Sequence, residues 1–219
     1  NVAADIYTDF WYLGNSQPVY IFPDEAGETV QIRSSNAADN QVIRVFGNDE
    51  NGLEVIEDVT LNGTSNVTLA NTYTALNRAY NSSSTEIQGD ITIDGVVSGN
   101  IFIFIDAREQ QTTQAIYTVP SNKYAAILNV STAMNRGGNT DVTTLARFTT
   151  QEPVGVFRTQ IRYGLQKRGT SNISSDLIIP AVYPPSTRIK LSMESDTADT
   201  DVSAEFSIML IDEDRLGAM

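Results

Sequence analysis

The sequence contains no cysteine and no histidine. The absence of cysteine excludes disulfides and thiolate metal sites. The absence of histidine excludes Ser-His-Asp and Cys-His nucleophile systems, HExxH zinc sites and histidine-based acid–base chemistry. An enzyme made from this chain would have to use carboxylates, lysine, tyrosine or a hard metal ion.

Basic residues and long apolar runs are also scarce. The 219 residues include 14 Lys and Arg against 27 Asp and Glu, which gives a formal net charge of −13. A surface this acidic repels the phosphates of nucleic acids. The longest apolar runs, such as Ile101–Ile105, are far shorter than the ~20 residues of a membrane-spanning helix. We therefore expect neither a nucleic-acid partner nor a membrane partner.

Alternation of apolar and polar side chains runs through almost the whole sequence. Ser186–Ser195, Asp201–Asp212 and Val156–Tyr163 show it most clearly. A period of two is typical of half-buried antiparallel strands, and abundant Thr, Ser, Asn and Gly fit strands and turns. The pattern predicts fourteen strands: Val19–Phe22, Thr29–Ser34, Gln41–Phe46, Leu53–Leu61, Thr74–Tyr80, Glu86–Ile93, Val96–Ile105, Gln114–Val119, Lys123–Thr132, Asp141–Thr150, Gly155–Tyr163, Asp176–Pro180, Thr187–Met193 and Val202–Asp212.

A polar segment near the middle, Asp106–Gln114, lacks a periodic apolar face. It predicts a boundary between two domains, 1–109 and 110–219. About seven strands in about 105 residues is the size of an immunoglobulin-like or jelly-roll sandwich. The predicted fold is therefore all-β, with two consecutive antiparallel β-sandwich domains. The first domain carries an aromatic N-terminal arm.

The two halves share a local order of elements. Ile32–Val59 and Val130–Ile161 each run from a strand through an Asn-rich loop to a strand with Arg and Phe, then a turn and a further strand. An ancient duplication and the ordinary rhythm of antiparallel strands both explain this similarity.

The acidic stretch GNDENG, residues Gly47–Gly52, has the composition of a metal-binding loop. An EF-hand loop would place its first ligand at Gly47, which has no side-chain oxygen, and its closing ligand at Asp58 instead of the usual Glu. We therefore predict a hairpin turn in which Asn51-Gly52 supplies positive φ. Asp94-Gly95 predicts a second, two-residue hairpin.

Two further groups of carboxylates deserve the same test. Glu54, Glu57 and Asp58 follow the acidic loop, and a glycosidase would need two such groups facing each other, one with a raised pKa. We expect them to be solvated. Asp196, Asp199 and Asp201 predict a polar loop, with a weak calcium site as the alternative. The sequence thus predicts no catalytic, cofactor-binding or metal-binding residues, and no enzyme.

Two groups of residues are candidates for a partner interface. Phe10, Trp11 and Tyr12 form an aromatic cluster, which we expect to pack on the first domain, with docking on a partner subunit as the alternative. Arg158 and Arg162 fall four residues apart on one predicted strand, and so on one face of it. This basic face is either solvated or docks on an acidic neighbour, including another copy of the chain.

Several segments together resemble virion structural proteins of tailed bacteriophages, particularly those of marine and cyanobacterial phages. They are QVIRVFGNDENGLEVIEDVTLNG with YTALNRAY, and AIYTVPSNKYAAILNVSTA with ARFTT and SAEFSIMLIDE. The resemblance implies an all-β virion component without an enzymatic role. Proteins of this kind include head decoration or cement proteins and tail or fibre components.

These observations lead to three functional hypotheses. The first is a capsid decoration or cement protein on the capsid exterior, which bridges major capsid subunits as a trimer or dimer. The second is a tail or fibre protein that binds host surface glycans, with Tyr163 and Tyr183 stacking on sugars from loops. The third is a carboxylate glycan hydrolase, which requires a raised-pKa carboxyl group close to a second one.

Overall fold

The computed structural model describes residues 7–11, 19–135, 142–167, 170–196 and 201–216. The fold is all-β: within these ranges fourteen strands, β1 to β14, pair antiparallel, and one short helix, α1 (Glu213–Leu216), follows them. The chain divides into two compact units. The first unit is Tyr20–Gln114, and the second consists of Asn1–Val19 together with Ala115–Met219. No helix among the described residues has the length and apolar character to span a membrane.

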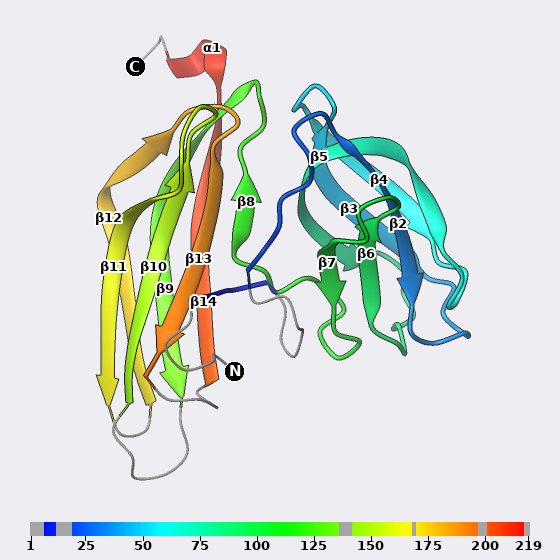
Figure 1. Cartoon of the computed structure of the whole chain (residues 1–219), viewed down its shortest axis with the longest axis horizontal. Coiled ribbons are helices and arrows are strands. Elements are labelled where there is room, and N and C mark those ends of the chain that lie inside the picture. Colours follow the sequence, from blue (N-terminus) through cyan, green and yellow to red (C-terminus); the bar gives the residue numbers. More distant parts are fainter. Residues whose placement is uncertain (1–6, 12–18, 136–141, 168–169, 197–200, 217–219) are drawn as a thin grey trace. The chain divides into compact units, whose positions relative to one another are not determined.

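The first unit is one six-stranded sheet with the order β4-β3-β5-β2-β6-β7 (Figure 1). Its central strand β5 is long enough to pair with β3 through its C-terminal part and with β2 through its N-terminal part. The strands are β2 (Glu28–Ser34), β3 (Val42–Asp49), β4 (Glu54–Thr60), β5 (Val67–Asn81), β6 (Ile91–Gly95) and β7 (Ile101–Ile105).

A bulge in β5 lets this sheet curl around its core. On β2, Thr29 pairs with Thr72 and Gln31 with Thr68, so β5 carries extra residues between these pairs. Such bulges bend a strand and turn sheet corners. The curled sheet encloses one apolar cluster contributed by all six strands, whose largest fully buried members are Ile32, Ile43, Tyr73, Leu76, Ile91, Ile93, Phe102, Ile103 and Ile105.

The second unit is a sandwich of two sheets. One has the order β1-β13-β10-β11, with β8 also paired to β13, and the other has the order β12-β9-β14. The strands are β1 (Thr8–Asp9), β8 (Ile116–Thr118), β9 (Lys123–Asn135), β10 (Val142–Gln151), β11 (Arg158–Lys167), β12 (Thr170–Tyr183), β13 (Arg188–Ser195) and β14 (Asp201–Asp212). Phe148, Ile127, Val130 and Leu191 lie in the apolar core.

The connections of this sandwich follow a jelly-roll path. From β8 to β14, only the β10–β11 hairpin stays within one sheet, and every other step crosses to the opposite sheet. The resulting orders, β8-β13-β10-β11 and β12-β9-β14, are those of a jelly roll from its second to its eighth strand. Of the two topologies that the sequence left open for this half, the strand order matches the jelly roll.

The predicted hairpin turn is confirmed, but it is confined to residues 50–52, because Gly47 to Asp49 belong to β3, and only Gly52 of the Asn51-Gly52 pair has positive φ. It joins β3 to β4, and Gly52 has a φ of 73°. The Asp49 carboxylate accepts hydrogen bonds from the backbone N–H groups of Asn51 and Leu53, at 2.8 and 2.9 Å. This carboxylate therefore stabilises the turn from within.

Two local predictions are wrong. Val19–Phe22 is not a strand. Asp94-Gly95 is not a two-residue turn, because both residues belong to β6 and the turn follows at residues 96–100. Gly95 has a packing role there, since a Cβ at this position would collide with the Glu28 carboxylate.

The similarity between the two halves does not extend beyond a hairpin. Arg44 and Phe46 are two residues apart on β3, whereas Arg147 and Phe148 are adjacent on β10 and so lie on opposite faces. The units also differ in strand order. The rhythm of antiparallel strands explains the similarity without a duplication.

Candidate interaction surface

The N-terminal arm packs on the second unit, which corrects the expectation that it covers the first. The Phe10 N–H donates to the Leu191 carbonyl at 3.0 Å, and the Phe10 carbonyl accepts from the Ala115 N–H at 2.6 Å. Its ring contacts the apolar clusters of the second unit, and Trp11 is only 3% exposed. Tyr12 lies outside the described residues. Phe10 and Trp11 are therefore largely covered by their own chain.

A buried ion pair fastens the same arm. Asp9 lies in β1 and pairs with Lys190 of β13, with 2.8 Å between Oδ2 and Nζ. Their side chains are 3% and 14% exposed. The Lys190 ammonium also lies 4.7 Å from the centre of the Phe157 ring. Charge and aromatic contact thus hold β1 along the edge of the larger sheet.

A β-bulge separates the two arginines that the sequence places on one face of β11. Phe148 pairs with Ile161, but the next residue of β10, Thr149, pairs with Thr159, so Gln160 is the extra residue. Side chains of paired residues share a face, and a one-residue insertion reverses the alternation beyond it. Arg162 therefore lies on the outer face of the sheet, opposite Arg147, while Arg158 points to the other face, beside Thr150. The prediction of a shared face is wrong.

The outer face holds an unusual cation pair. Arg147 and Arg162 are direct cross-strand partners, and the Arg147 guanidinium lies 3.1 Å from the centre of the Tyr7 ring. The Arg147 Nε atom is buried and has no hydrogen-bond partner. Within the described part of the chain, neither arginine forms an ion pair with a carboxylate. Sequence reasoning missed Arg147 because its pairing with Arg162 is set by strand register.

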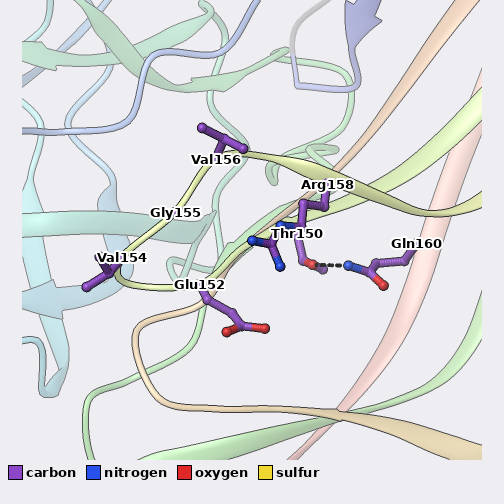
Figure 2. Close-up of a pocket in the computed structure, with 7 residues that line it drawn as sticks. All are labelled: Thr150, Glu152, Val154, Gly155, Val156, Arg158 and Gln160. Atoms are coloured by element: carbon purple, nitrogen blue, oxygen red, sulfur yellow. Dashed lines mark hydrogen bonds between the residues drawn. The ribbon is translucent and has the colours of Figure 1, made fainter.

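Arg158 instead lines a small hollow beneath the β10–β11 loop. Figure 2 shows this hollow, and the Gln160 amide donates to the Thr150 hydroxyl at 2.9 Å across it. Val154 and Val156 at the tip of the loop are 97% and 71% exposed. The hollow is lined by Thr150, Glu152, Val154, Gly155, Val156, Arg158 and Gln160. It contains a single carboxylate, so it lacks the pair that glycoside hydrolysis uses.

Among the described residues, every carboxyl group with a shifted pKa has a lowered one. A general acid needs a raised pKa. Burial raises the pKa of Glu57, but hydrogen bonds from Ala70, Asn71 and Tyr73 outweigh it and the net shift is downward. Hydrogen bonds from Arg108 lower the pKa of Asp106 to about 2. The carboxyl groups of Asp39, Asp58 and Asp212 also have lowered pKa values.

Each of these carboxylates has a visible structural task. Asp39, for example, accepts hydrogen bonds from the Ser34 hydroxyl and from the backbone N–H groups of Gln88 and Gly89, at 2.6 to 2.9 Å. It thereby ties the β2–β3 loop to the segment before β6. No group of three or more acidic residues with metal-binding geometry occurs within the described ranges.

The acidic segment around Asp196 is only partly described. The Asp196 carboxylate accepts from the Thr143 N–H at 3.1 Å, which joins the end of β13 to the start of β10. Asp199 lies outside the described residues, and the structure describes the backbone of Asp201 at the start of β14.

The two tyrosines suggested for glycan stacking are not on loops. Tyr163 lies in β11 and Tyr183 in β12, and both pack against the core of the second unit. The Tyr183 ring lies 6.1 Å from that of Phe148. Both rings are thus partly covered by that core.

Comparison with known proteins gives limited similarity. No family model and no curated protein matches the sequence. Among solved structures, the chain is similar to one from infectious bursal disease virus, Gx strain, with 15% identity and a TM-score of 0.28 over 94% of this chain and 66% of the other. A chain from the Gt strain of the same virus is 13% identical, with a TM-score of 0.27 over 93% of this chain and 57% of the other.

Both neighbours come from virus structures, and this chain spans less than two thirds of the length of each. A similarity of this size does not define a fold. The jelly-roll assignment of the second unit follows from its own strand order.

Proposed function

We propose that this protein is a non-enzymatic structural component of a virion, and more specifically a capsid decoration or cement protein. The observation that carries the proposal is the jelly-roll strand order of the second unit, an architecture frequent in viral capsid proteins. The resemblance of several sequence segments to virion proteins of tailed phages supports it. The lowered pKa values of the shifted carboxylates agree with a role that needs no acid–base catalysis.

The proposed mechanism is adhesive. The protein would bind the capsid exterior across the joints between major capsid subunits, as a dimer or trimer. Each bridging contact of standard size buries about 1,600 Å² and adds interface that the shell alone lacks. Such contacts resist the outward pressure of packaged DNA. The net charge of −13 favours basic surfaces on the capsid partner.

The test is a comparison of particles with and without this protein. We expect stripped or deletion particles to release DNA at a lower temperature and to recover when the purified protein is added back. Quantitative mass spectrometry should find hundreds of copies per particle, in line with one per capsid joint. Full thermal stability of particles lacking the protein would contradict a cement role, and a copy number in the dozens would indicate a tail component.

A further inference from the structure

We propose that Arg147 and Arg162 form a docking site for carboxylates, and that its occupant is the acidic β3–β4 hairpin of a second copy of this chain. The contact joins the second unit of one copy to the first unit of another. This contact requires no capsid, so it can be tested independently of the proposed virion role.

No ion pair within the described residues compensates the charges of Arg147 and Arg162. Like charges directly opposite each other on neighbouring strands destabilise a sheet, and Arg147 and Arg162 are cross-strand partners. The nearby Glu194 accepts a hydrogen bond from the Tyr7 hydroxyl. The Tyr7 ring in turn stacks on Arg147, and the Arg147 Nε atom keeps no hydrogen-bond partner.

A carboxylate is the ligand that relieves this arrangement. Guanidinium groups bind carboxylates through paired, charge-assisted hydrogen bonds, and two adjacent arginines offer donors to two carboxylates. Arg162 is exposed and reachable from solvent, and Tyr7 keeps the Arg147 guanidinium in place. The site is therefore partly preorganised, which reduces the entropy lost on binding.

Charge segregation in the chain identifies the occupant. Residues 20–114 contain fourteen acidic residues (Asp and Glu) but only four basic ones (Lys and Arg). The rest of the chain contains thirteen acidic and ten basic residues. Glu50 in the β3–β4 turn and Glu54 at the start of β4 are both exposed. Neither forms an ion pair within the described residues. Two exposed carboxylates on one hairpin thus match two guanidinium groups, and none of the four forms an ion pair within the described residues.

The two surfaces differ, so the contact is of the head-to-tail type. Every copy carries one arginine pair and one acidic hairpin. Contacts of this kind close into rings or extend into chains. The mass of the assembly should therefore depend on protein concentration.

The experiment is sedimentation velocity on the full chain over a range of concentrations, at about 0.05 M and about 0.5 M salt. We expect association at low salt that weakens at high salt, because exposed charges are screened. Arg162→Glu should lower the association constant at least tenfold, since close charge pairs at interfaces contribute more than about 1.4 kcal/mol. Arg158→Glu is the matched control, because the bulge directs this residue to the other face; it should leave association unchanged.

A mixing experiment identifies the partner surface. The double variant Glu50→Arg/Glu54→Arg should also fail to associate on its own. An equal mixture of this double variant with the Arg162→Glu variant should associate. In that mixture each altered surface meets one of opposite charge. Thermal unfolding of each variant at high salt verifies that it is folded, and Arg162→Gln serves as a milder second variant.

Three results would overturn the proposal. They are a wild-type chain that stays monomeric at low salt, equal losses for Arg158→Glu and Arg162→Glu, and no recovery in the mixture.

Discussion

At the scale of single residues, Glu57 shows why an acid on an outer strand is more than solvated surface. Its carboxylate accepts hydrogen bonds from the backbone N–H groups of Ala70 and Asn71, at 2.7 and 3.2 Å, in the bulged part of β5. It also accepts from the Asn71 amide and the Tyr73 hydroxyl. One side chain thus satisfies the donors that the bulge removes from the sheet. The corner of the first unit depends on it.

We therefore predict that Glu57→Gln lowers the free energy of unfolding by about 1–3 kcal/mol, because hydrogen bonds to a charged acceptor are lost or weakened. Chemical denaturation at pH 7 and high salt measures it. Glu54→Gln, exposed on the same strand, should change the value by less than about 0.5 kcal/mol. Equal effects of the two substitutions would show that the network around Glu57 contributes nothing.

The same carboxylate predicts a dependence on pH. The pKa of Glu57 is lower in the folded chain than its ordinary value of 4.5. Its contribution is therefore complete above about pH 4.5 and is lost as pH falls through the folded pKa. The difference in unfolding free energy between wild type and Glu57→Gln should stay constant from neutral pH down to that point and shrink below it. A difference that grows on acidification would contradict this sign.

Asp9 gives a second prediction at this scale. Asp9→Asn leaves the Lys190 charge, which is 14% exposed, without its carboxylate. Breaking a buried ion pair from one side costs about 3–5 kcal/mol, whereas replacing both partners costs less. We expect Asp9→Asn to destabilise the second unit more than Asp9→Asn/Lys190→Met does. Thermal denaturation of the three proteins tests this order, and a single variant as stable as wild type would refute it.

At the scale of elements, alternation in the sequence predicts strands well and their partners poorly. Thirteen of the fourteen predicted segments overlap an observed strand, because a half-buried strand needs a period of two. Val19–Phe22 fails since it finds no strand to pair with. β1 has only two residues, Thr8–Asp9, and exists because β13 offers a free edge there. Pairing of this kind is a tertiary event that a local pattern does not record.

The bulge in β11 limits the prediction of the candidate site in the same way. Sequence spacing alone puts Arg158 and Arg162 on one face, and one extra residue, Gln160, puts them on opposite faces. The basic character of the strand could be read from the sequence. The pairing of Arg162 with Arg147 could not, because it depends on the register between β10 and β11. The packing of Phe10 against the second unit was equally hidden, since its partners Ala115 and Leu191 lie more than a hundred positions away.

At the scale of the whole molecule, the path of the chain decides which parts can fold alone. The first unit is continuous, Tyr20–Gln114, with a core of its own. The second unit is discontinuous, because its larger sheet needs β1 from the N-terminus beside β8 on the edge of β13. The segment 115–219 on its own therefore lacks the ion pair of Asp9 with Lys190 and the packing of Phe10.

We predict that residues 20–114, expressed alone, unfold in one cooperative transition with a far-UV spectrum of β-structure. Residues 115–219 alone should melt at least 10 °C below the same unit in the full chain, because without Asp9 the buried Lys190 loses its ion pair, which costs about 3–5 kcal/mol, and 1 kcal/mol shifts the midpoint by about 4–8 °C. A synthetic peptide of residues 1–19 should raise this midpoint in a concentration-dependent way. The same peptide with Asp9→Asn and Phe10→Ala is the control and should have little effect. If residues 115–219 melt at the full-chain temperature without the peptide, the arm does not contribute to the stability of the sandwich, and the prediction is wrong.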